Sequence, residues 1–326
     1  MPIPWRHWLK DRVPKSAWTR LRSFKHLTLI RLRTCLERSG VILTRKSDFY
    51  SPLPSELYLQ RTRNRWAQPS ALHGIHYDLP LLKTRFSELC QKYLTEFQCL
   101  PAYNLLGAMG FGPGFPLLDA FTLYSVLRAT KPARYLEVGS GLSTYYSHLA
   151  RERNTQEGWP MEITCIEPYP YEALKRVPSI RLIQAEVQGV SVDVFRSLRA
   201  NDVLFIDSSH VLKIGSDVPF LCLEVLPTIA SGVNVHIHDV AFPFNVPYPP
   251  EYWTLLEHPE SPHWPMFWNE AMLVQAFLAF NAHFEITHSC PLLRYYEEEF
   301  LKSLLPFYQP ISEQPNTFSS LWLRKA

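Results

Sequence analysis

The sequence predicts an α/β fold, a doubly wound sheet of seven strands with a basic helical extension in front of it. Three observations lead to this prediction. Short apolar runs alternate with helical segments from residue 117 onward, which is typical of parallel βαβ units. A glycine turn follows the first of these runs. Two further runs, at 283–289 and 318–325, are suited to pair as antiparallel strands at the sheet edge.

The expected elements follow one another in a regular order. Helical segments are expected at 80–97, 117–128, 143–153, 216–229 and 268–281 from the spacing of their apolar residues. Between and after them lie short runs rich in β-branched and aromatic residues, which favour strands. The expected strands are the runs ARYLEV, EITCIE, IRLIQA, DVLFID, NVHIHD, HFEITHS and FSSLWLRK.

The composition is that of a globular protein. The 326 residues carry a formal net charge of +3 and are 46% hydrophobic and 19% charged, which excludes wholesale disorder and collagen-like repeats. No apolar run approaches the ~20 residues that a membrane-spanning helix needs, and the opening MPIPWRHWLKDR lacks the apolar stretch of a secretory signal. Six scattered cysteines form no CxxC pair, so we expect reduced thiols and a cytoplasmic location.

Residues 1–100 are predicted to form a basic N-terminal helical or cap extension to a domain at 101–326. The first 46 residues hold twelve lysines and arginines but only two acids, and a helix is expected over 15–38. This helix could pack on its own domain or on a second subunit of a homo-oligomer. It could also lie on an anionic membrane surface, or be a cleaved organellar presequence. No specific nucleic-acid partner is expected.

The strongest local motif is EVGSGLST at residues 137–144, where a strand runs into two glycines and then into a helix. Such a turn lets a ligand approach the backbone and the exposed amides at the helix start, so it suits a nucleotide-like ligand. Thr144 occupies the third glycine position of the dinucleotide fingerprint, which disfavours an NAD dehydrogenase. Glu167 ends the next strand, where a carboxylate can accept hydrogen bonds from both hydroxyls of a ribose.

This turn and the strand-ending acid resemble those of the class I S-adenosylmethionine-dependent methyltransferases, and the resemblance spans about 117–326. That family has a Rossmann-like seven-stranded sheet with an antiparallel last strand. The resemblance implies that the first acid and the turn hold the methionine part of S-adenosyl-L-methionine. It also implies that the second acid holds the ribose and that residues after the third strand, around Gln184, Ala185 and Glu186, contact the adenine. The implied cofactor-binding residues are Glu137, Gly139, Ser140, Gly141, Ser143, Glu167, Gln184, Ala185 and Asp207.

Two acids end neighbouring strands of the expected sheet. Asp207 follows the fourth strand and Asp239 the fifth, with His210 and His238 close by in sequence. Two converging carboxylates repel each other unless a proton, a cation or a basic group lies between them. One expectation is a divalent cation, Mg²⁺ or another metal, held by Asp207, His238 and Asp239. The other is acid–base chemistry with His210 as the base or orienter, and Asp207 and His238 as the further catalytic candidates. His236 is expected to be a buried, hydrogen-bonded histidine.

The motifs DSSH and HIHD resemble those of metal-dependent O-methyltransferases of the catechol and macrolide-sugar types, and of a bacterial subgroup often found with glycan or natural-product genes. Such metal-dependent relatives often place Asp-Asp or Asp-Asn at the end of the fifth strand. This chain departs from that pattern, because it has His238, Asp239 and Val240 there.

Residues 240–268 are rich in proline and aromatic residues and are expected to form a substrate loop, since aromatic faces suit sugar rings and phenols. The alternative is that these aromatic side chains pack the loop down and hold the helix that follows. The leading hypothesis is therefore an S-adenosylmethionine-dependent methyltransferase. It would be O-directed, act on a small hydroxylated molecule or glycan, and work with or without a divalent metal. One alternative is a metal-dependent hydroxylase-like or hydrolytic enzyme on the same fold. The other is a non-catalytic ligand-binding or scaffold protein.

Overall fold

The computed structural model describes residues 28, 30–41, 51–101, 103, 105, 109–112, 114–255, 266–310 and 319–326. The chain separates into two compact units, 1–58 and 59–326. In the first unit residues 30–38 are helical, which confirms that part of the helix expected over 15–38, whereas residues 15–27 and 29 lie outside the described residues. No helix in the described ranges is both long and apolar enough to cross a bilayer.

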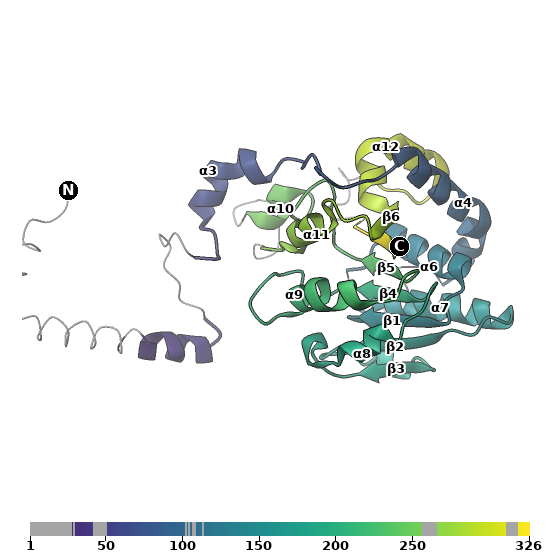
Figure 1. The fold of residues 1–326 in the computed structure, drawn as a ribbon, viewed down its shortest axis with the longest axis horizontal. Helices are drawn as coiled ribbons and strands as arrows, with labels where there is room; N and C mark the ends of the chain where they lie inside the picture. The colour runs from purple at the N-terminus through teal and green to yellow at the C-terminus, as the bar shows by residue number, and fades with distance from the viewer. Residues whose placement is uncertain are drawn as a thin grey trace, which may run out of the picture. The chain divides into compact units, whose positions relative to one another are not determined.

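The second unit is built on the seven-stranded sheet that the sequence predicts. Its strand order is β3-β2-β1-β4-β5-β7-β6 (Figure 1). The first five strands run parallel, and β7 lies antiparallel between β5 and β6. The strands are β1 Arg134–Val138, β2 Glu162–Ile166, β3 Ile180–Ile183, β4 Val203–Ile206, β5 Asn234–Ile237, β6 Phe284–Ser289 and β7 Leu321–Lys325. This is the doubly wound, Rossmann-like sheet of the methyltransferase type, so the predicted fold class is confirmed.

Helices cover both faces of the sheet. In Figure 1, α6 and α7 lie on one side of the strands and α8, α9 and α11 on the other. The α-helices are α3 Glu56–Trp66, α4 Leu79–Gln98, α6 Leu117–Thr130, α7 Leu142–Gln156, α8 Val192–Arg196, α9 Asp217–Phe220, α10 Pro250–Thr254, α11 Glu270–Leu278 and α12 Cys290–Leu304. Short helical turns are η1 Leu174–Arg176, η2 Val187–Gly189, η3 Leu221–Val225 and η4 Leu226–Thr228. The helix expected over 216–229 is therefore a succession of α9, η3 and η4.

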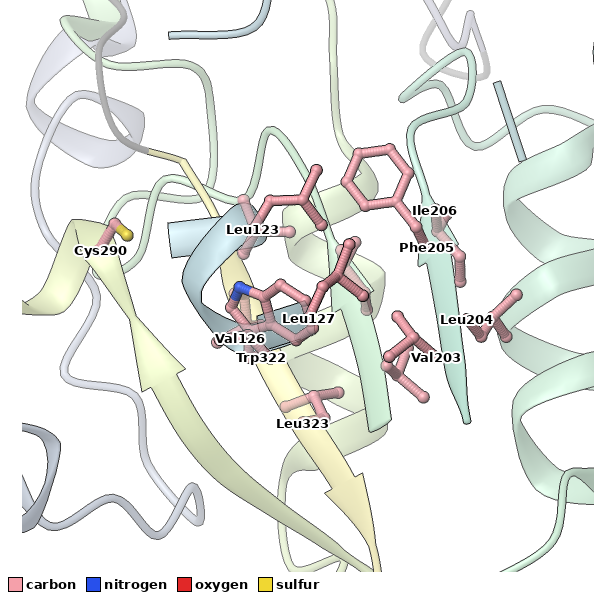
Figure 2. Packing of buried hydrophobic residues seen from close by; sticks show 14 of the residues in the cluster. Leu123, Val126, Leu127, Val203, Leu204, Phe205, Ile206, Cys290, Trp322 and Leu323 are labelled. Atoms are coloured by element: carbon pink, nitrogen blue, oxygen red, sulfur yellow. The ribbon is translucent and has the colours of Figure 1, made fainter. Parts of the chain in front are cut away.

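The core lies between α6 and the middle strands. All four residues of β4 and of β5 are buried, as expected for strands covered on both faces. Figure 2 shows residues of α6 packed against β4 and β7, with the indole of Trp322 among them. Truncating a large side chain in such a core typically costs about 2–5 kcal/mol. The labelled residues are Leu123, Val126, Leu127, Val203, Leu204, Phe205, Ile206, Cys290, Trp322 and Leu323.

A buried arginine joins three helices behind the sheet. The guanidinium of Arg128 on α6 donates to Glu96 of α4 at 2.7 Å, and it also pairs with Glu157 at the end of α7. Asn154 on α7 accepts a further hydrogen bond from Arg128 and donates to the Leu127 carbonyl at 3.0 Å. These bonds hold α4, predicted at 80–97, against the domain that follows it. The division at residue 100 stays a prediction.

Four α-helices of the described residues were not among those expected from the sequence, namely α3, α8, α10 and α12. Helix α3 lies in a stretch that is dense in arginine and has a weak apolar stripe. Helix α12 occupies much of the gap between the two terminal strands, with Pro291 in its first turn and a non-helical residue, Glu297, inside it. Proline is tolerated at a helix start because its missing N–H has no intrahelical partner there.

Candidate functional site

The glycine turn after β1 brings three strand ends close together. Gly139 has φ +97°, and a Cβ on it would lie 2.3 Å from the Asp207 carbonyl oxygen, so only glycine fits. The backbone N–H of Gly139 donates to Ile166 O at 3.0 Å, and that of Asp207 donates to Val138 O at 2.9 Å. The turn is therefore locked between the ends of β2 and β4. The N–H of Gly141 bonds the hydroxyl of Thr144 at 3.0 Å and starts α7.

Glu137 lies behind this turn and is fully buried. Its Oε1 accepts a hydrogen bond from the Ser143 hydroxyl at 2.5 Å. Burial raises the pKa of Glu137 to about 8, even though bonds from Ser143 and Thr144 favour the carboxylate. Glu137 and Ser143, both predicted to bind the methionine part of the cofactor, therefore bond each other beneath the turn. Their predicted contact with the cofactor stays a prediction.

A cleft of about 570 Å³ opens in front of the turn. Glu167 lies on its wall at the end of β2. One carboxylate oxygen accepts from the Tyr169 N–H at 2.7 Å, and the other lies 3.5 Å from the hydroxyl of Ser140. The cleft is lined by Val138, Gly139, Ile166, Glu167, Pro168, Tyr169, Glu186, Val187, Gln188, Asp207, Ser208, Ser209, Lys213, Ile214, Gly215, Ser216 and Asp217.

Of the three residues after β3 that were expected near the adenine, Glu186 lines the cleft, whereas Gln184 and Ala185 do not. Gln184 is exposed, and its amide donates to Pro168 O at 3.3 Å. Neither Gln184 nor Ala185 is among the lining residues, which are instead the next three, 186–188. A turn at η2 brings these three residues to the cleft. The adenine contacts predicted for Gln184 and Ala185 stay a prediction.

A cluster of two histidines and two aspartates adjoins the cleft, and Asp207 belongs to both. His210 Nε2 lies 3.2 Å from Asp207 Oδ1 and 3.4 Å from Asp239 Oδ2. His238 Nδ1 lies 3.5 Å from the same oxygen of Asp207 and 3.6 Å from that of Asp239. The ends of adjacent strands β4 and β5 therefore bring together all four side chains that the sequence analysis singled out.

Two buried carboxylates that the sequence analysis did not single out contact the other ring nitrogens of these histidines. Glu270, at the start of α11, accepts from His210 Nδ1 at 2.9 Å. Asp119 on α6 lies 3.3 Å from His238 Nε2 and also accepts the Ser319 N–H at 2.9 Å. Each acid sits in a largely apolar helical segment, and a buried charge in such a segment usually has a partner. That sequence signal could have found both.

The charges of the cluster depend on one another. Burial disfavours the imidazolium of His210, but Asp207, Glu270 and Asp239 outweigh it and raise the pKa of His210 well above 6.5. Burial also disfavours the protonated form of His238, and Asp239 and Asp207 again outweigh it, so its pKa is raised as well. Conversely, burial opposes ionisation of Asp207, while the two histidines hold its pKa well below the usual range.

The cluster also fits a cation. One ligand atom from each of Asp207, His238 and Asp239 can be chosen so that all lie within 4.8 Å of one another. His238 Nδ1 is buried and makes no hydrogen bond, although it faces both carboxylates. Oxygen ligands suit Mg²⁺, whereas an imidazole among them favours a transition metal such as Mn²⁺ or Fe²⁺. The predicted metal ligands are thus placed together, in a group that could hold a divalent ion.

His236 differs from its two neighbours in the cluster. It is fully buried, stacks on Trp322 with 4.2 Å between ring centroids, and bonds the Ser320 hydroxyl at 2.7 Å. Burial lowers its pKa well below 6.5, and His238 adds to the effect, so it is neutral. The expectation of a buried, hydrogen-bonded histidine is confirmed.

The aromatic loop after β5 is described over 240–255 and 266–268, and Trp264 lies outside the described residues. Its first aromatic residues, Phe242 and Phe244, are buried. Trp268 lies over the ring of His210 with 4.5 Å between centroids. One end of the loop is therefore packed against the His–Asp cluster.

Residues 136–240 match the family model described as a methyltransferase domain. The match runs from β1 to the residue after Asp239, so it includes the glycine turn, Glu167 and the strand-end residues of the cluster. This part of the chain is therefore similar to a methyltransferase domain, and the sheet order is the one expected for that fold.

The chain is also similar to an uncharacterised protein of Archaeoglobus fulgidus, with 27% identity over 193 residues that cover 56% of this chain and 86% of that protein. Among solved structures it is similar to the O-methyltransferase TomG of Streptomyces achromogenes (14% identity, 77% of this chain and 91% of that one, TM-score 0.36). It is likewise similar to an O-methyltransferase of Bacillus cereus (11% identity, 82% and 96%, TM-score 0.35).

Proposed function

We propose that the protein transfers the methyl group of S-adenosyl-L-methionine to an oxygen of a small hydroxylated acceptor. One observation carries the proposal. Asp207 lines the cleft beside the glycine turn and also belongs to the His–Asp cluster, so the cleft and the acid–base groups share a residue. A donor in the cleft and an acceptor hydroxyl at the cluster would therefore meet at Asp207.

In this proposal Glu167 binds the ribose hydroxyls of the donor. Its carboxylate is already oriented at the cleft wall by the Tyr169 N–H. Gly139 lines the cleft, so the methionine part would lie beside the turn. S-adenosyl-L-methionine, when bound, supplies an electrophilic methyl group, so the protein mainly has to align the two reactants and accept a proton.

His210 is the group placed to take the proton of the acceptor hydroxyl. Glu270 orients its ring through Nδ1, which leaves Nε2 directed to Asp207 and Asp239. Asp207, Glu270 and Asp239 raise the pKa of His210, and its neutral form is the one that would accept the proton. A divalent cation held by Asp207, His238 and Asp239 would acidify the bound hydroxyl and assist this step.

Donor binding is the direct test. S-adenosylhomocysteine, the demethylated donor, is titrated by calorimetry into the full chain and into the Glu167→Ala variant. We expect the variant to bind about 10- to 100-fold more weakly, because charged hydrogen bonds of this kind contribute about 1.5–3 kcal/mol. Glu172→Ala is the matched control, since Glu172 is an exposed acid in the same loop. Failure of the full chain to bind S-adenosylhomocysteine would refute the proposal. Equal affinity of Glu167→Ala and Glu172→Ala for it would refute the role of Glu167.

A further inference from the structure

A second cavity opens at the same edge of the sheet as the donor cleft. Its volume is about 230 Å³, and it lies between the segment after β5 and the first turns of α12. Residue Ile237 of β5 and Ser289 of β6 both pair with Leu321 of β7, so the segments after β5 and β6 start side by side. We call this cavity the aromatic pocket. Its lining residues are Ala241, Phe242, Phe244, Tyr248, Pro291, Arg294, Tyr295 and Glu298.

The aromatic pocket and the donor cleft lie on opposite sides of the His–Asp cluster. The cleft spans the ends of β2, β1 and β4, whereas the pocket lies beyond β5, next to β7 and β6. Ala241 in the pocket wall follows Asp239 by two residues, so the Cα atoms of the two residues are at most about 7 Å apart. A hydroxyl group of a ligand bound in the pocket could therefore extend to the His–Asp cluster while the donor occupies the cleft.

The walls of the pocket suit a flat ring. The Phe244 and Tyr248 rings lie with centroids 4.5 Å apart, and Tyr295 meets Phe244 edge-on at 5.7 Å. A further aromatic ring can pack on such side chains in an offset or edge-on geometry.

One wall also carries a buried positive charge. Arg294 is only 8% exposed, and its guanidinium lies 5.1 Å from the centroid of the Tyr248 ring. The acid in the same wall, Glu298, already contacts Lys302 at 3.4 Å and accepts from Tyr308 at 3.0 Å. A guanidinium has five N–H donors in a planar fork, so a ligand carboxylate can bind it alongside other partners.

We propose that the aromatic pocket holds the acceptor, and that the acceptor is an aromatic ring bearing both the reactive hydroxyl and a carboxylate bound by Arg294. This inference rests on the proposed function. It narrows the substrate class from small hydroxylated molecules to phenolic acids, and it assigns Tyr248 and Arg294 the recognition of the ring and of the charge.

The test compares two probes of equal size with the full chain loaded with S-adenosylhomocysteine. The probes are 4-hydroxybenzoate and the neutral 4-hydroxybenzamide, and binding is measured by titration calorimetry and ligand-observed NMR. We expect the benzoate to bind at least tenfold more tightly. Arg294→Met should abolish this preference, whereas Arg153→Met, at an exposed arginine of α7, should keep it.

A second variant guards against misfolding of the Arg294 protein, which is checked by circular dichroism and thermal unfolding. Tyr248→Leu should weaken both probes about tenfold and leave the charge preference unchanged. If S-adenosylhomocysteine binds but the two probes bind equally or not at all, the inference is wrong while the proposed function stands. Tighter binding of glucuronate than of 4-hydroxybenzoate would also overturn it, in favour of a sugar acid. Failure to bind S-adenosylhomocysteine would instead count against the proposed function.

Discussion

Replacing Gly139 by alanine probes the close contact at the end of β1. The backbone there has φ +97°, which costs an L-residue about 1–2 kcal/mol. The new Cβ would also lie 2.3 Å from the Asp207 carbonyl oxygen, and that atom cannot retreat without loosening the bond from the Asp207 N–H to Val138. Forced overpacking of this kind typically costs about 1–3 kcal/mol more. We therefore expect a total loss of about 2–5 kcal/mol.

Gly158 provides the matched control. Its φ is +88°, close to that of Gly139, but a Cβ there would meet nothing within 4 Å. Gly158→Ala should therefore show the conformational cost alone, about 1–2 kcal/mol. Urea unfolding of both variants isolates the contact with Asp207 as the difference between them. Titration with S-adenosylhomocysteine should show weaker binding only for Gly139→Ala, because only that change displaces the cleft wall. Equal losses of stability and unchanged donor affinity would refute the reasoning.

The remaining predictions concern the helix junction and the cation. Arg128→Met should lower the free energy of unfolding by about 2–4 kcal/mol in urea at pH 7, because two acids lose a buried partner. Arg128 and Lys131 lower the pKa of Glu157 to about 2, so the stabilisation is complete above its ordinary value of 4.5 and is lost as the pH falls toward 2. The variant should therefore lose less stability than the native chain over that range, and parallel pH profiles would contradict this origin. Mn²⁺ should raise the melting temperature of the native chain but not of Asp239→Asn, and a shift of equal size in both would exclude Asp239 as a ligand. EDTA should reduce the rate of methyl transfer. Full activity in EDTA would show that a bound cation does not assist, and that His210 acts as the base without one.

Local sequence patterns were sufficient to predict the sheet and the strand ends. The strands are short apolar runs separated by helical segments, so the local residue pattern is enough to locate them along the chain. Because carboxyl ends of parallel strands share one edge, Asp207 and Asp239 could be placed together from their positions after β4 and β5. The same reasoning placed Gly139 and Glu167 beside them.

The partners of the cluster could not be predicted in the same way, because they come from distant parts of the chain. Asp119 accepts a hydrogen bond from a backbone N–H that lies 200 positions later, at Ser319, and Glu270 bonds His210 across 60 positions. Local periodicity carries no information on such pairings. Helix α12 was missed although its sequence is amphipathic, since Leu293, Phe300, Leu301 and Leu304 recur at helical spacing and Ser289 caps its start.

The place of β7 between β5 and β6 has a consequence for biosynthesis. Residues 321–325 fill an interior position of the sheet, and the backbone at 319 and 320 caps the carboxylate of Asp119. During translation, β5 and β6 emerge from the ribosome without the strand that joins them. The sheet therefore cannot close between β5 and β6 until these last residues have been translated.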